Sequence, residues 1–216
     1  MTIVSIHQPT YLPWLGFFNK IISSEKFVFL DDVQYQKNEF QNRNKIRVFN
    51  GEMWLTVPVK TKSNTLLKDV KIDYTSNWIK KHIKSIELNY SNSKFFNNYW
   101  SELESIFKRK YDNLMELNIE MIKFFLEKLK INTKTIFSSE LNISDKSSDR
   151  ILKICKALDA DTYIAITKKF KTPTEILNVL HYTIKKVQGG IFVSVFSLLL
   201  CEWRLHRHLP NMTDNR

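Results

Sequence analysis

The stretch IVSIHQPTYLPWLGFFNK, residues 3–20, decides how this chain begins to fold. Its opening apolar run predicts a buried β-strand, and His7 and Gln8 follow at once. Pro9 and Pro13 fix backbone angles and remove hydrogen-bond donors, so the chain must turn between them. Apolar residues then recur at helical spacing, and Pro13 suits the first turn of that helix. The stretch therefore predicts strand, rigid turn and helix, with two polar side chains at the carboxyl end of the strand.

A second strand is predicted over residues 26–30, and Asp31 and Asp32 follow it directly. The helix between the two strands allows a right-handed crossover, which makes the strands parallel. Parallel strands end at the same edge of a sheet, and open α/β sheets bind ligands at that edge. We therefore expect His7, Gln8, Asp31 and Asp32 to lie along one edge.

The next stretch, residues 34–45, is dense in amide and cationic side chains. Such a loop is either solvated surface or a set of ligand contacts, and its position beside the predicted edge favours ligand contacts. Residues 45–49 and 54–60 then predict a β-hairpin across Asn50 and Gly51. Pro58 assigns the second of these strands to a sheet edge because proline cannot donate to a ladder.

Helical periodicity dominates residues 77–130, where the aromatic residues are expected to form core. A strand over 135–137, a helix over 149–158 and a strand over 161–164 complete the pattern. The fold class expected is α/β: a Rossmann-like parallel-sheet core with an inserted β-hairpin and a helical subdomain. Residues 1–164 are expected to form this α/β domain.

The composition sets bounds on partners and compartment. The net charge is +11, from 33 basic and 22 acidic residues, which indicates either a polyanionic partner or a lysine-rich compositional bias. The lysines are spread along the chain, which favours compositional bias. The 2 cysteines, Cys155 and Cys201, lie far apart and indicate free thiols in a reducing, cytoplasmic setting. No apolar run reaches the roughly 20 residues of a spanning helix, and no signal peptide is expected.

The blocks HQPTYLPWLGFFNKI, FVFLDDVQYQKNEFQNRNKI and WLTVPV, with the later SSDRILKICKALDADTYI, resemble the WbqC-like family of bacterial proteins. The similarity covers roughly residues 3–164. The family occurs with polysaccharide and O-antigen biosynthesis genes, beside enzymes that make nucleotide-linked amino sugars. The resemblance implies a transferase that modifies such a sugar by acyl or aminoacyl transfer to its amine. It implies no particular cofactor.

The matching residues also serve as candidates for site roles. His7 suits a general base, because its ordinary pKa is about 6.5 and the attacking amine must lose a proton. Asp31 or Asp32 would orient His7 or fix the amine or a ribose hydroxyl. Arg43 and Lys45 would hold a diphosphate. The candidate substrate-binding residues are Gln8, Tyr11, Trp14, Gln34, Asn38, Asn42, Arg43, Asn44 and Lys45. No residue spacing suggests a metal site.

Two alternatives remain open. The start of the chain is faintly similar to nucleotidylyltransferases, although the second histidine of those enzymes is missing. The positive charge and the mixture of aromatic and basic residues also permit an RNA-binding module without chemistry. The RNA interpretation is compatible with the transferase if an aminoacyl-tRNA is the acyl donor.

The similarity stops after residue 164. Residues 165–216 have mixed periodicity and an apolar run, IFVSVFSLLL, in place of the family pattern. We interpret this segment as the product of a shifted reading frame, or as a remodelled and partly disordered C-terminus.

Overall fold

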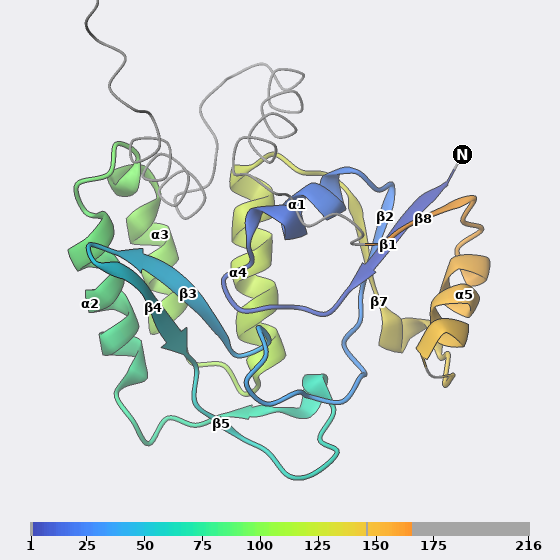
Figure 1. The fold of residues 1–216 in the computed structure, drawn as a ribbon, viewed down its shortest axis with the longest axis horizontal. Helices are drawn as coiled ribbons and strands as arrows, with labels where there is room; N and C mark the ends of the chain where they lie inside the picture. Colours follow the sequence, from blue (N-terminus) through green and yellow to red (C-terminus); the bar gives the residue numbers. More distant parts are fainter. Residues whose placement is uncertain (1, 146, 166–216) are drawn as a thin grey trace, which may run out of the picture.

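A computed structural model describes residues 2–145 and 147–165 of the chain (Figure 1). The interpretation of residues 165–216 as frameshifted or remodelled lies outside the described residues, apart from residue 165 itself.

The fold is built on a four-stranded parallel sheet with the order β7-β2-β1-β8. The strands are β1 (Ile3–His7), β2 (Lys26–Phe29), β7 (Lys134–Phe137) and β8 (Thr162–Ile164). This confirms the predicted α/β class with a parallel-sheet core. The chain steps outward from β1 to β2 and β7, and then returns to place β8 on the other side of β1. The order therefore reverses between β1 and β8, which is where such sheets form a crevice.

Helices cover the sheet on both faces. Helix α1 (Leu15–Ile22) joins Phe27 and Phe29 of β2 in the larger of two hydrophobic cores. Helix α5 (Ser147–Ala157) packs with Val28 and apolar residues of β1 in the smaller core on the opposite face. This division follows from the two-residue alternation of strand side chains.

The predicted hairpin forms with a different register. Strands β3 (Arg43–Val48) and β4 (Gly51–Thr56) are antiparallel, and Val48 pairs with Gly51. The two turn residues are thus Phe49 and Asn50, not Asn50 and Gly51. Gly51 begins β4 with a φ of 139°, which L side chains rarely adopt.

The predicted strand over 54–60 is also divided in two. Strand β4 ends before Pro58, which cannot donate to a ladder, and β5 (Val59–Lys60) pairs instead with β6 (Lys71–Ile72). A short 3₁₀ turn, η1 (Leu67–Asp69), precedes β6.

Three helices fill the predicted helical tract: α2 (Trp78–Tyr90), α3 (Phe96–Lys108) and α4 (Leu114–Lys128). Helix α4 lies between the sheet with α1 and the layer formed by α2, α3 and the hairpin (Figure 1). Ring contact between Phe18 of α1 and Phe125 of α4, at 5.7 Å between centroids, joins the two parts in one core.

The turn after β1 is held by the hairpin. Asn44 donates its side-chain amide to the carbonyl of Leu12 at 2.6 Å and to that of Tyr11 at 3.3 Å. Leu12 has a φ of 45°, an uncommon conformation for a non-glycine residue, and these bonds stabilise it. Trp14 is the N-cap of α1, so Pro13 precedes the helix and does not occupy its first turn as predicted.

Candidate site at the carboxyl edge of the sheet

His7 closes β1 and is fixed by a hydrogen bond to its own neighbour. Its Nδ1 lies 2.8 Å from the carbonyl oxygen of Gln8. A carbonyl only accepts, so Nδ1 carries the proton and Nε2 presents a lone pair. Edge-on contacts with Trp14, at 5.4 Å between ring centroids, and with Phe17, at 5.3 Å, hold the ring plane. The imidazole is therefore oriented as a proton acceptor.

Burial sets the charge state of His7. Loss of solvation lowers its pKa from 6.5 to about 4, and the hydrogen bond to Gln8 opposes this change only in part. The charge of Lys20 lowers the pKa of His7 further. The ring is thus neutral at physiological pH and able to accept a proton.

Lys20 also lies at this edge, although it was not among the site residues predicted from the sequence. It projects from α1, is only 6% exposed, and its Nζ donates to the carbonyl oxygen of Ile6 at 2.7 Å. No carboxylate of the described residues lies within ion-pair distance of it. Burial lowers its pKa from 10.5 to about 8. The signal in the sequence is that Lys20 shares the apolar face of α1 with Phe17 and Ile21.

Lys20 lies beside the point where the strand order reverses. Its Nζ is 5.9 Å from the centroid of the Tyr163 ring on β8, and it bonds to β1 through Ile6. A buried cation and a neutral imidazole therefore lie near each other toward the carboxyl end of β1, and we call them the His7–Lys20 half of the edge.

Asp31 and Asp32 form a different half of the edge, in contact with β7 and α5. The buried carboxylate of Asp31 accepts from the Ser138 hydroxyl at 2.9 Å and from the Ser139 hydroxyl and amide at 2.7 and 3.0 Å. Asp32 accepts from Ser138 and from Arg150 of α5. The bonds from Ser138 and Arg150 outweigh burial and lower the pKa of Asp32.

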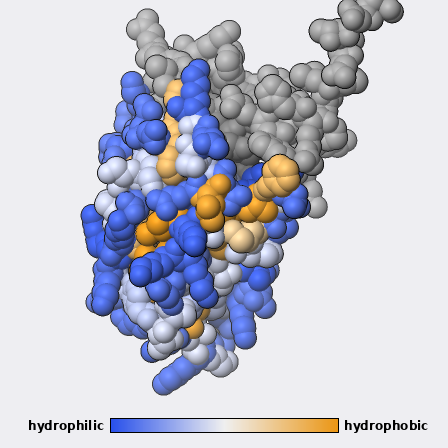
Figure 2. All heavy atoms as spheres, turned by 90° about the vertical axis from the view of Figure 1, so that its left-hand side faces the viewer, coloured by the Kyte–Doolittle hydropathy of each residue, from blue (hydrophilic) through white to orange (hydrophobic). Residues whose placement is uncertain are grey.

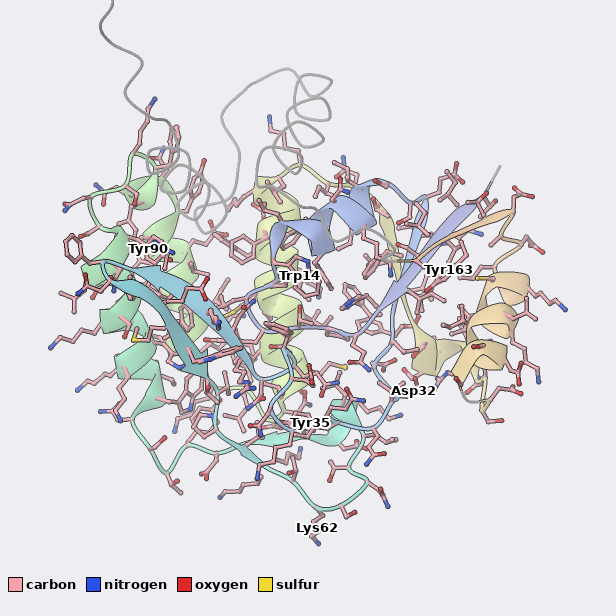
Figure 3. The ribbon with its side chains drawn as sticks, viewed as in Figure 1. Trp14, Asp32, Tyr35, Lys62, Tyr90 and Tyr163 are labelled. Atoms are coloured by element: carbon pink, nitrogen blue, oxygen red, sulfur yellow. The ribbon has the colours of Figure 1, made fainter. Side chains whose placement is uncertain are left out.

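The two halves do not touch through hydrogen bonds. None of the described hydrogen bonds joins His7 to Asp31 or Asp32, and the Nδ1 of His7 is already occupied by Gln8. Figure 3 shows Asp32 toward α5 and Trp14 apart from it, below α1. The expected role of an aspartate in orienting His7 does not fit this geometry, although all of these residues share the predicted edge.

Several predicted amide contacts serve the scaffold. Gln41, only 1% exposed, donates to Oε1 of Gln8 at 2.7 Å and accepts from the amide of Gln36 at 2.8 Å. Asn42 donates to the carbonyl of Val57 at 2.9 Å, and Asn44 holds the turn described above. The polar loop is thus largely folded inward, and these amides satisfy backbone groups.

Gln34 and Asn38 lie farther out on the same loop. Gln34 donates to the side-chain oxygen of Asn64 at 3.1 Å. Asn38 has a φ of 67°, and its carbonyl accepts from the guanidinium of Arg43. This last bond positions Arg43 over the hairpin.

Tyr11 belongs to the core and not to an open surface. It is fully buried, and its hydroxyl lies 2.8 Å from Nδ1 of His82. Burial raises the pKa of Tyr11 well above 10 and lowers that of His82 to about 4. The pair joins the turn after β1 to α2, and Tyr11 is not placed to stack on a ligand.

Three half-exposed rings continue outward from His7, and we call them the aromatic ladder: Trp14, Phe40 and Trp54. They are 36%, 42% and 41% exposed, and each neighbouring pair of centroids is 6.0 Å apart. A Cβ on Gly16 would lie 2.7 Å from Nε1 of Trp14, so glycine is needed where the indole crosses α1.

Two cations accompany the ladder. The guanidinium of Arg43 lies 4.4 Å from the centroid of Trp54, and Nζ of Lys45 lies 5.2 Å from it. Lys45 also pairs with Glu52 at 2.9 Å. The ladder thus offers ring faces and positive charge to a ligand that carries π systems and phosphates.

Within residues 2–145 and 147–165, no group of three or more histidine, cysteine, aspartate or glutamate side chains is placed to hold a metal ion. The same residues contain no helix with the length and apolar character required to cross a membrane.

These observations define a doubly wound α/β protein whose carboxyl edge carries an oriented imidazole, a buried lysine and an aromatic surface. The model of the WbqC-like protein family matches residues 8–171, and the chain belongs to this family. The chain is also similar to an uncharacterized protein, Rv1507c, of Mycobacterium tuberculosis (strain ATCC 25618 / H37Rv). The identity is 32% over 168 residues, which is 76% of this chain and 72% of that protein. No solved structure matches the chain.

Proposed function

We propose that this protein is a transferase that moves an acyl or aminoacyl group onto the amine of a nucleotide-linked amino sugar in surface-polysaccharide biosynthesis. The observation that carries the proposal is the neutral, oriented His7 beside the buried Lys20 at the point of strand reversal. The association of the family with polysaccharide genes supplies the substrate class.

His7 supplies the base that this chemistry requires. The sugar nitrogen attacks the acyl carbonyl, and a C–N bond forms as the bond between the carbonyl carbon and the donor's leaving group breaks. Nε2 of His7 takes the proton lost by the amine and returns it to the leaving group. With a pKa of about 4 the ring is a weak base, so it would accept this proton only as the C–N bond forms and the nitrogen becomes positively charged and acidic.

Lys20 supplies charge rather than a proton. With a pKa of about 8 it is mostly protonated at neutral pH. A positive charge buried in the crevice stabilises either the oxyanion that develops on the acyl carbonyl or a phosphate of the substrate.

The nucleotide part of the substrate would lie along the aromatic ladder. Its base would stack on the exposed rings, and Arg43 and Lys45 would contact the diphosphate. The ladder begins at His7, so a ligand along it would bring its sugar toward the imidazole.

The test is mass spectrometry of nucleotide-linked amino sugars incubated with the protein and a panel of acyl and aminoacyl donors. We expect a mass increase that matches one acyl group, and turnover that falls by about 10² or more in His7→Gln. Release of pyrophosphate when a nucleoside triphosphate and a sugar phosphate are supplied in place of these substrates would indicate nucleotidyl transfer instead. If His7→Gln keeps wild-type turnover, His7 is not the base.

Lys20 has a matched control in Lys26. The Nζ of Lys26 also donates to a backbone carbonyl, that of Leu158 at 2.8 Å, but Lys26 begins β2 and so lies at the opposite edge of the sheet. We expect Lys20→Met to lose turnover and Lys26→Met to retain it. Equal losses would indicate a general effect on the fold and would remove Lys20 from the site.

A further inference from the structure

Outside the carboxyl edge, a groove runs between α2 and the β3–β4 hairpin. Its larger part has a volume of about 520 Å³ and is lined among others by Met53, Ser76 and Leu88. A smaller part, of about 200 Å³, lies toward the hairpin turn and is lined by Phe49 and Asn89. Leu88 borders both parts, so the two depressions are neighbours along α2, and we call them together the groove.

The groove is apolar inside and basic around it. Phe49 and Leu88 are 76% and 72% exposed, which is unusual for large apolar side chains. Lys81 and Lys84 of α2 line the larger part, and Arg47 lines the smaller part. None of the described residues that line either part is acidic. Figure 2 shows apolar side chains on this face gathered between hydrophilic ones.

The shape indicates a chain-like ligand. Helix α2 has 13 residues, so a groove along it extends for about 20 Å at the rise of an α-helix. Hydroxyl and amide groups of Ser76, Ser85 and Asn89 are interspersed with the apolar lining. A ligand that alternates methylene and amide groups and ends in phosphate would match both the lining and the charge.

The groove is connected to the candidate site through one residue. Trp54 lines the larger part and is also the outer ring of the aromatic ladder. The groove therefore meets the outer end of the aromatic ladder, so an arm held in the groove would lie beside a nucleotide on the ladder. The groove and the ladder would then hold two substrates side by side, and the free end of the arm would leave the groove at Trp54 to bring its acyl group to the acceptor.

From this arrangement we propose that the groove binds a phosphopantetheine arm that carries the acyl group as a thioester. This inference rests on the proposed acyl transfer, because it names the donor of that reaction. The arm lies in the larger part of the groove, with Lys81 and Lys84 against its phosphate and its thioester end at Trp54. In the transfer, the C–S bond of the thioester breaks as the C–N bond to the sugar forms, and the proton from the amine leaves with the thiol.

Binding is tested without any sugar acceptor. Calorimetric titration of the full chain with coenzyme A and with octanoyl-coenzyme A is expected to show saturable binding that weakens as salt rises. The double variant Lys81→Ala, Lys84→Ala should bind at least tenfold more weakly. Leu88→Ser, in the wall of the groove, should weaken the binding of both ligands about threefold or more.

The matched control is Lys80→Ala, since Lys80 is an exposed lysine of α2 outside the groove lining. It removes one positive charge, as each single substitution of the double variant does, and should bind as the wild type does. An equal loss in Lys80→Ala would indicate general charge attraction and would overturn the assignment. Failure of both ligands to bind at low salt would overturn it too, as would a double variant that binds normally.

A second titration distinguishes whether the arm comes from a free thioester or from a carrier protein. It uses 4′-phosphopantetheine and an acyl carrier protein that bears the same arm. Tighter binding of the carrier protein assigns the arm to a protein, and tighter binding of coenzyme A assigns it to the free thioester. Either supports the groove. Binding of tRNA in competition with both would replace the inference with an RNA site.

Different results would refute the proposed function and the proposed donor groove. Binding of the thioester in the groove without transfer to any amino sugar would leave the groove assigned and remove the proposed function. Transfer that depends on His7 but is unchanged by the groove substitutions would keep the function and remove the donor site.

Discussion

The two halves of the carboxyl edge use polar side chains in opposite ways. Asp31 and Asp32 accept hydrogen bonds from two serines and an arginine, so each carboxylate is well supplied with donors. Lys20 has a backbone carbonyl as its partner, and His7 has another. The first half is electrostatically satisfied, whereas the second half holds a charge and a basic nitrogen that are both poorly solvated.

On this difference rests our proposal that the His7–Lys20 half carries the chemistry. A satisfied network of buried groups stabilises the fold and gains little from a ligand. A buried lysine and a histidine with strongly lowered pKa values cost stability, and groups of this kind cluster at functional sites. The carboxylates were the more conspicuous feature of the sequence, yet their partners make them part of the scaffold.

The largest expected contrast is in stability. Asp31→Ala removes a buried acceptor from Ser138 and Ser139 and should cost about 2–4 kcal/mol of the free energy of unfolding. Lys20→Met replaces a buried charge by an apolar group of similar length and should change that free energy by less than about 1 kcal/mol. Urea unfolding of the two variants measures both. A Lys20→Met loss as large as that of Asp31→Ala would erase the distinction between the halves.

The halves should also lose stability in different pH ranges. The pKa of His7 is lower in the folded protein, about 4 against 6.5, so the unfolded chain binds the proton first and stability falls between those values. Asp32 also has a lowered pKa, so its contribution is present above 3.8 and is lost below it.

Urea unfolding between pH 7.5 and 4.5 should therefore show a loss that His7→Gln reduces by about 1–2 kcal/mol. His82 has a similarly lowered pKa and accounts for the part that remains. Asp32→Asn should leave the loss in this range unchanged. An Asp32→Asn variant that flattens it would contradict the assignment of the two ranges.

The smallest expected effect concerns the alkaline limit of turnover. Activity should rise through about pH 4, where His7 loses its proton, and fall above about pH 8, where Lys20 loses its charge. Lys20→Arg keeps the charge and should retain up to tenfold more relative activity at pH 9 than the wild type. The measurement is kcat/KM against pH, and an unchanged alkaline limb would assign that limb to another group.

Much of the fold followed from the sequence. The apolar strands, the polar residues after them and the helical repeats predicted the parallel sheet and the helices, because these patterns are local. The predicted hairpin turn lies one residue too close to the C-terminus. Gly51 follows the turn because it pairs with Val48, and this pairing is not visible in the local sequence. The domain boundaries and the function of the site residues remain predictions.

The site was predicted less well, because its properties depend on distant partners. Ser138 lies 107 residues from Asp31, and no local pattern shows that it occupies the carboxylate. Tyr11 was assigned to a ligand surface, but its hydroxyl finds His82, which lies 71 residues away, within the core. The aromatic ladder joins the turn after β1 to β4 through Phe40, which had not been selected at all.

By itself the sequence determined that a parallel sheet forms and that polar residues collect at its carboxyl edge, because strand alternation, helix periodicity and proline positions act over a few residues. Only the tertiary structure decided which of those residues are satisfied and which are not. Hydrogen-bond partners and burial come from contacts between distant segments, and they alone separate the carboxylates of the scaffold from the histidine and lysine of the crevice.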